Sequence, residues 1–131
     1  MGLEYEALTE KIIACAIAVH RELGPGFLES IYENALCVEL KTQQIPFQRQ
    51  LRVPVAYRSV EVGLHRLDLL VAGKIVVELK NIKKIENVHF VIVRSYLHAV
   101  ERNHGLILNF SKPELEIKRV ARRFFPGFLG S

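Results

Sequence analysis

The apolar positions in the first third of the chain follow a helical period. Leu8, Ile12, Cys15, Ala16 and Val19 fall on one stripe of a helix that is predicted over residues 4–22. The sequence Gly24-Pro25-Gly26 is typical of a helix end. A second helix is predicted from about residue 27 to residue 42, before Ile45-Pro46.

Beyond Pro46 the pattern changes to that of strands. Residues 47–57 alternate polar and apolar positions around Pro54, which predicts an edge or irregular strand. The elements expected after it are a strand hairpin over 65–81, a helix over 85–102, and strands over 105–110 and 114–120. This order, α, α, β, β, β, α, β, β, predicts one α/β domain over residues 1–131.

The hairpin segment HRLDLLVAGKIVVELKN, residues 65–81, places Asp68, Glu78 and Lys80 in strands whose other residues are mostly apolar. Such strands are usually buried on both faces. A buried carboxylate without a partner costs roughly several kcal/mol. The three charged side chains are therefore expected either to pair with one another or to bind a cation.

The length of the turn decides whether the two carboxylates meet. A two-residue loop sends Asp68 and Glu78 to opposite faces of the hairpin, because side chains alternate along a strand. A three-residue loop over residues 72–74, which contains a glycine, pairs Val71 with Ile75. This register, or a bulge, sets Asp68 directly across from Glu78.

Opposed carboxylates repel, and a hard divalent cation such as Mg²⁺ or Mn²⁺ compensates them by taking oxygen ligands from both. We expect Asp68 and Glu78 to hold this metal, with the Leu79 carbonyl as a possible third oxygen. Lys80 lies one strand repeat further and is expected to hold a water or a phosphate oxygen. The pattern thus favours a divalent metal site.

Two motifs resemble a known family. Asp68, followed after nine residues by Glu78-Leu79-Lys80, resembles the D…(D/E)xK signature of the PD-(D/E)XK nuclease superfamily. Gly26-x-x-Glu29-x-x-Tyr32 is similar to the hallmark of the small bacterial GxxExxY proteins, a branch of that superfamily. The resemblance implies a restriction-endonuclease-like fold, with a mixed central sheet flanked by helices, that cuts DNA or RNA. It also implies Glu29 as an additional metal ligand.

Other residues have two interpretations each. Glu29 is either a ligand or a first-turn glutamate that the helix dipole favours, and Tyr32 either contacts the active site and substrate or lies at the edge of the core. Family members usually carry Gln four residues before a Tyr-Leu pair, where this chain has Ile92. Arg94 is a candidate phosphate contact in its place; the alternative is a solvated helix arginine.

The charge distribution permits a nucleic-acid partner. The formal net charge is +4, Lys83 and Lys84 follow the hairpin as candidate substrate contacts, and basic residues recur over 118–123. A solvated basic edge is the alternative. No apolar run is long enough to span a membrane, and Glu4 and Glu6 argue against a signal peptide, so we expect a cytoplasmic protein without membrane contact.

Three functions follow from these observations. The first is a Mg²⁺- or Mn²⁺-dependent nuclease that uses an activated water. The second is a catalytically inactive, nuclease-like module that binds nucleic acid or protein, which Ile92 in place of Gln favours. The third is a structural domain in which salt bridges replace the metal. The sequence does not indicate an oligomeric state.

Overall fold

The computed structural model describes residues 2–123, with side chains from Tyr5 onward. The elements are α1 (Gly2–Leu23), α2 (Glu29–Thr42), β1 (Phe47–Tyr57), β2 (Val60–Val71), β3 (Ile75–Lys80), α3 (Asn87–Val100), β4 (His104–Asn109) and β5 (Glu116–Ala121). Their order confirms the predicted succession of helices and strands. Within the described residues, no helix combines the length and hydropathy needed to cross a membrane.

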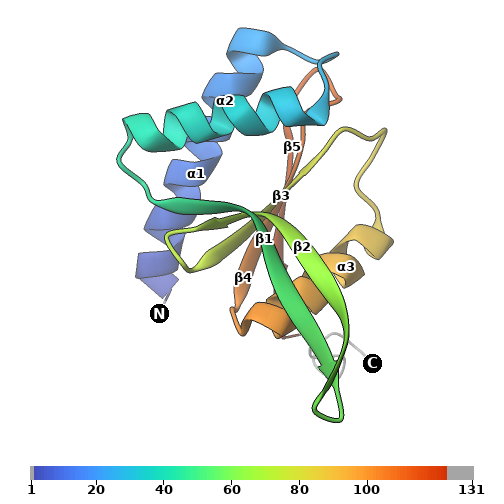
Figure 1. The fold of residues 1–131 in the computed structure, drawn as a ribbon. Coiled ribbons are helices and arrows are strands. Elements are labelled where there is room, and N and C mark those ends of the chain that lie inside the picture. Colours follow the sequence, from blue (N-terminus) through green and yellow to red (C-terminus); the bar gives the residue numbers. More distant parts are fainter. Residues whose placement is uncertain (1, 124–131) are drawn as a thin grey trace, which may run out of the picture.

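The strands form a five-stranded mixed sheet in the order β1-β2-β3-β4-β5. Neighbouring strands are antiparallel, except that β3 and β4 run parallel. Helices α1 and α2 pack on one face of the sheet and α3 packs on the other (Figure 1). The predicted α/β fold, restriction-endonuclease-like with helices on both faces, is therefore confirmed, and β1 is an edge strand, as Pro54 predicts.

Two apolar layers hold the helices on the sheet. The layer under α1 and α2 includes Tyr32 and Val77, and the layer under α3 includes Val76 and Leu97, all of them buried. Side chains of β3 alternate between the two layers. Glu78 therefore shares the α3 side of β3 with Val76.

Strands β1 and β2 form a long hairpin whose far end extends beyond the body of the protein (Figure 1). We call residues 51–67 the arm. The turn at its tip consists of Arg58 and Ser59, which both adopt positive φ, 51° and 67°. This conformation suits a tight hairpin but usually selects Gly or Asn. The turn carries neither residue, and β2 begins at Val60, five residues before the predicted start at residue 65.

Both strands change face at the base of the arm. In β1, Phe47 packs on the α1–α2 side, whereas Val53 packs on the α3 side, although they are six positions apart and regular alternation would put both on one face. Gln50 lies between them with a φ of 48°, and such a residue interrupts strict alternation. In β2 the change falls between Leu67 and Leu69.

Candidate metal centre

The predicted three-residue turn between β2 and β3 is confirmed, because Val71 pairs with Ile75. Gly73 takes positive φ as expected, and Ala72 does so as well, at 66° and 53°. Main-chain pairing of these strands continues to Leu69 and Val77 and ends there. The next two residues across from each other are Asp68 and Glu78, so the site lies where the ladder opens.

Each carboxylate replaces a missing ladder bond. The Asp68 N–H donates to Glu78 Oε2 over 2.8 Å, and the Leu79 N–H donates to Asp68 Oδ2 over 2.9 Å. The two side chains thus reach across the gap between β2 and β3 from opposite strands. The register that a shared metal site requires is present.

The two carboxylates are poorly solvated and repel each other. Glu78 is only 4% exposed, and burial, followed by the negative charge of Asp68, raises its pKa to about 8. Burial also raises the pKa of Asp68, and the charge of Lys80 lowers the pKa of both groups. The positive charge of Lys80 therefore offsets only part of this repulsion.

Glu29 lies near this pair, at the first position of α2. Although the residue is exposed, burial of its carboxyl end raises its pKa, and the charge of Asp68 raises it further. Lys80 acts in the opposite direction. Asn81 Nδ2 donates to the Phe27 carbonyl over 3.0 Å, which ties the loop before α2 to the end of β3. The structure therefore brings Glu29, Asp68, Glu78 and Lys80 together.

Two neighbours of Asp68, Glu33 and Gln50, are not among the predicted site residues. Glu33 is 6% exposed and accepts from Arg49 Nε over 3.1 Å. Gln50 Nε2 donates to Glu33 Oε1 over 2.9 Å and to Asp68 Oδ1 over 3.4 Å. Glu33 follows Glu29 by one helical turn, which was a usable signal. No signal in the sequence pointed to Gln50, because its side chain reaches Asp68 only through its own left-handed backbone conformation.

Tyr32 lies inside the core and away from the carboxylate pair. It is fully buried, and its ring stacks on Phe110 with centroids 4.5 Å apart. Its hydroxyl donates to the Gly24 carbonyl over 2.6 Å and accepts from the Phe27 N–H over 3.1 Å. These bonds hold Phe27 outside the helix, so α2 begins at Glu29 rather than at the predicted residue 27.

Helix α3 presents Tyr96, not Arg94, to the carboxylates. Burial raises the pKa of Tyr96, and the charges of Glu78 and then Asp68 raise it further. Arg94 precedes Tyr96 by two residues, which turns it roughly 200° around the helix. Its Nε donates to the Ala121 carbonyl over 3.2 Å, at the end of β5. The structure does not bring Arg94 to the candidate site.

Lys83 and Lys84 are exposed on the segment that joins β3 to α3. The buried Asn109 fixes the path of this segment, because its Oδ1 accepts from the Ile82 N–H over 3.1 Å. Its Nδ2 donates back to the Ile82 carbonyl over 2.8 Å. Both lysines therefore follow Lys80 along a well-defined backbone.

The donor set fits a hard divalent cation. Within the described side chains, no group of three or more His, Cys, Asp or Glu residues is arranged to hold a metal ion by itself. Mg²⁺, however, is usually bound through one or two carboxylates and keeps several waters. Asp68 and Glu78 provide two such carboxylates. Burial raises the pKa of both, the charge of Asp68 raises that of Glu78 further, and a bound cation would favour the ionised forms.

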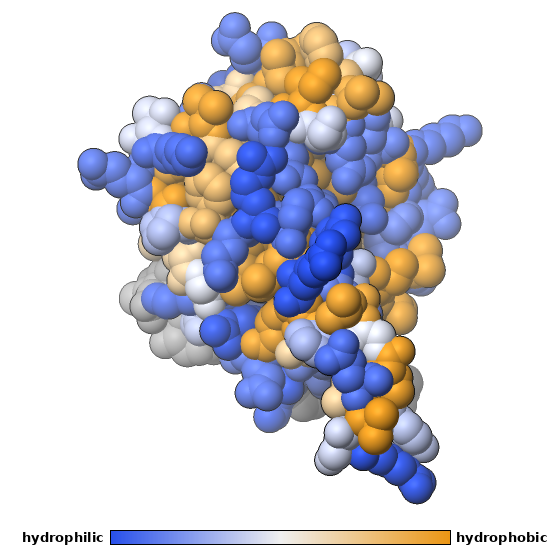
Figure 2. Space-filling view, viewed as in Figure 1, coloured by the Kyte–Doolittle hydropathy of each residue, from blue (hydrophilic) through white to orange (hydrophobic). Residues whose placement is uncertain are grey.

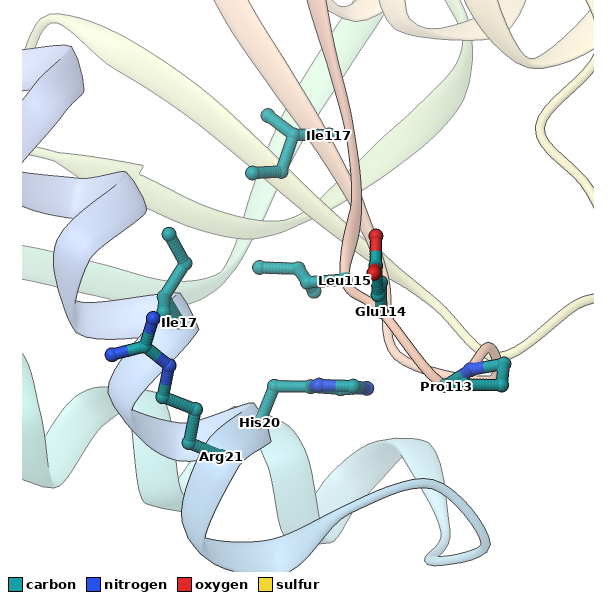
Figure 3. A pocket seen from close by; sticks show the side chains of 7 residues that line it. All are labelled: Ile17, His20, Arg21, Pro113, Glu114, Leu115 and Ile117. Atoms are coloured by element: carbon teal, nitrogen blue, oxygen red, sulfur yellow. The ribbon is translucent and has the colours of Figure 1, made fainter.

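A separate pocket of about 450 Å³ lies between the end of α1 and the residues around the start of β5 (Figure 3). It contains none of the predicted site residues; its lining includes Arg21 and Glu114 from the two sides. His20, which also lines it, has Nε2 2.8 Å from the Lys112 carbonyl oxygen. This contact gives His20 a structural role.

Known proteins resemble this chain in sequence profile and in fold. Residues 6–120 match the sequence profile of the PD-(D/E)XK nuclease superfamily. No curated protein matches the chain. The crystal structure of SSO0001 is similar in fold, with a TM-score of 0.59 and 13% identity; the match covers 97% of this chain and 64% of that chain, so this chain spans less than two thirds of its length. Because the profile covers most of the sequence, the chain belongs to the PD-(D/E)XK nuclease superfamily.

Proposed function

We propose that this protein is a metal-dependent nuclease that hydrolyses phosphodiester bonds of DNA or RNA with an activated water. The observation that carries the proposal is the reciprocal pairing of Asp68 and Glu78 across the opening of the β2–β3 ladder, with Lys80 one repeat further along β3. Chain order and spacing resemble the superfamily signature, and the register of β2 and β3 supports a common site for those residues.

Asp68 and Glu78 would hold Mg²⁺ or Mn²⁺, with the Leu79 carbonyl as a third oxygen and Glu29 as a ligand directly or through water. The bound ion would lower the pKa of a water and neutralise charge that develops on the phosphate. Lys80 would orient that water and contact a phosphate oxygen. The Leu79 N–H and the Gln50 amide keep the Asp68 carboxylate in place.

The surrounding residues would position the substrate and the early helix. Lys83 and Lys84 would contact neighbouring phosphates from the segment after β3. We assign the Gly26-x-x-Glu29-x-x-Tyr32 motif to the GxxExxY branch, in which Glu29 and Tyr32 would have different roles. Tyr32 holds the loop before α2 through its hydroxyl, and Glu29, whose pKa the charge of Asp68 raises, would serve the metal site.

One observation favours a binding module without catalysis. The helical position at which the family usually carries Gln is Ile92, which lies one turn before Tyr96 on α3. Gln50 supplies an amide to Asp68 from β1 instead. If this amide does not serve the reaction, the protein would bind nucleic acid and leave it intact.

A cleavage assay separates the two functions. The assay incubates labelled single-stranded and duplex DNA and RNA with Mg²⁺ or Mn²⁺ and one of three proteins: the wild type, Lys80→Ala or Lys41→Ala. Lys41 is the control, because it is an exposed lysine at the end of α2. We expect metal-dependent cleavage by the wild type and Lys41→Ala, and none by Lys80→Ala, which should still bind. Binding without cleavage by the wild type would support the module instead.

A further inference from the structure

The arm carries an arginine pair two residues beyond Gln50 on β1 and two residues before Asp68 on β2. Arg52 of β1 and Arg66 of β2 are register partners, and both are exposed. Like charges directly opposite each other in a sheet are destabilising. Among the described residues, no hydrogen bond or salt bridge engages either guanidinium group. Two adjacent, unpaired guanidinium groups form a site that is complementary to an anion.

The pair faces the same side of the sheet as α2. Val53 packs on the α3 side, and its register partner His65 contacts the ring of Tyr96 on α3, with centroids 4.6 Å apart. Because side chains alternate along each strand, the neighbouring Arg52 and Arg66 project to the opposite side. Gln50 projects there too, since its amide reaches Glu33 of α2.

The separation of the pair from Asp68 and Gln50 along the strands suits a polymer of phosphates. Arg66 precedes Asp68 by two residues, and Arg52 follows Gln50 by two, which corresponds to roughly 7 Å along each strand. Phosphates advance by roughly 3.4 Å per nucleotide along the axis of one duplex strand, so this step spans about two nucleotides. Figure 2 shows strongly hydrophilic side chains over the base of the arm, with hydrophobic ones interspersed toward its tip.

We propose that Arg52 and Arg66 form a phosphate-binding pair that holds the nucleic-acid backbone beside the scissile phosphate. The inference rests on the proposed nuclease function for the identity of the anion and deepens it, because it makes the β1–β2 arm part of the substrate-binding surface. Guanidinium groups bind phosphate oxygens through paired N–H donors, and the phosphate would relieve the repulsion between the two side chains.

Salt-dependent binding tests the pair without requiring cleavage. Dissociation constants for duplex and single-stranded oligonucleotides are measured in EDTA over a range of salt for the wild type and the Arg52→Gln/Arg66→Gln variant. Lys11→Gln/Lys41→Gln is the matched control, because it removes the same number of exposed charges from α1 and α2. Circular dichroism verifies that all three proteins are folded.

Each phosphate contact contributes roughly 0.9 to the slope of log affinity against log salt for duplex, and roughly 0.7 for single strands. For duplex, we expect the slope of the arginine variant to be smaller than that of the wild type by roughly 1.8. When the salt concentration rises fourfold, the wild type should therefore lose roughly ten times more affinity than the variant loses. The control should keep the wild-type slope. An unchanged slope in the arginine variant, or an equal loss in the control, would overturn the inference.

A parallel cleavage assay distinguishes the two proposals. A wild type that cuts nucleic acid while the arginine variant keeps its slope would overturn the arginine pair alone. If the wild type never cuts nucleic acid, but the arginine variant has a smaller salt slope than the wild type, the arginine pair is supported and the nuclease function is overturned. A wild type that binds no nucleic acid would overturn both.

Discussion

Replacing Glu78 with Gln is expected to reduce the dependence of stability on pH in the metal-free protein. Burial and the charge of Asp68 raise the pKa of Glu78 from 4.5 to about 8. Between these values the folded protein binds more protons than the unfolded chain, so the free energy of unfolding falls as the pH rises. In the Glu78→Gln variant the amide oxygen would accept the hydrogen bond from the Asp68 N–H without titrating, which isolates the ionisation.

The magnitude follows from the size of the shift. Each pKa unit corresponds to about 1.4 kcal/mol, so a rise from about pH 5.5 to about pH 7.5, inside the window, removes up to about 3 kcal/mol from the wild type. His104, whose pKa burial lowers, acts in the opposite direction below its ordinary value, but it is common to both proteins and cancels in the comparison.

Urea unfolding at several pH values in the presence of EDTA measures the effect. The wild type should lose about 3 kcal/mol more than Glu78→Gln over that range. Glu61→Gln, which removes an exposed carboxylate from the arm, should follow the wild type. Parallel curves for the wild type and Glu78→Gln would refute the reasoning that buried negative charge is concentrated at Glu78.

Three further outcomes are expected. At about pH 7.5, Mn²⁺ at about a hundredfold excess over its Kd should stabilise the wild type by ~3 kcal/mol, measured by thermal unfolding, and Asp68→Asn should lose most of that gain. Tyr32→Phe should lower the free energy of unfolding in urea by about 1–3 kcal/mol, because it leaves the Phe27 N–H and the Gly24 carbonyl without their partner. Cleavage per folded molecule should stay near that of the wild type. A selective loss of cleavage would indicate that Tyr32 contacts the substrate instead. Gln50→Gly should be about 1 kcal/mol more stable than Gln50→Ala in urea unfolding, since only glycine adopts a φ of 48° without strain, and equal stabilities would contradict this.

The hairpin that carries the candidate site could be predicted because its register depends only on the number of residues in the turn. A three-residue turn sets Val71 against Ile75 whatever the rest of the chain does, and Asp68 then lies across from Glu78. The order of helices and strands followed equally from the periodicity of apolar residues. Charged residues in buried strands therefore indicated where Asp68 and Glu78 would lie across from each other.

The remaining features depend on contacts distant in sequence or on single backbone angles. Helical spacing placed Glu29 and Tyr32 on one face of a helix, but the bonds of Tyr32 with the loop before α2 turn it into the core. The positive φ of Gln50 leaves no signal in the sequence, and neither does the turn at Arg58 and Ser59. The arm and the Gln50 contact could therefore be recognised only in the structure.

Crystals grown with Mn²⁺, measured at a wavelength where manganese scatters anomalously, test the central claim most directly. The account predicts an anomalous peak within coordination distance of the Asp68 and Glu78 carboxylates, and its disappearance in Asp68→Asn crystals prepared in the same way. No peak at this position in wild-type crystals, or a peak that persists in Asp68→Asn, would contradict the proposal that these two carboxylates hold a catalytic metal.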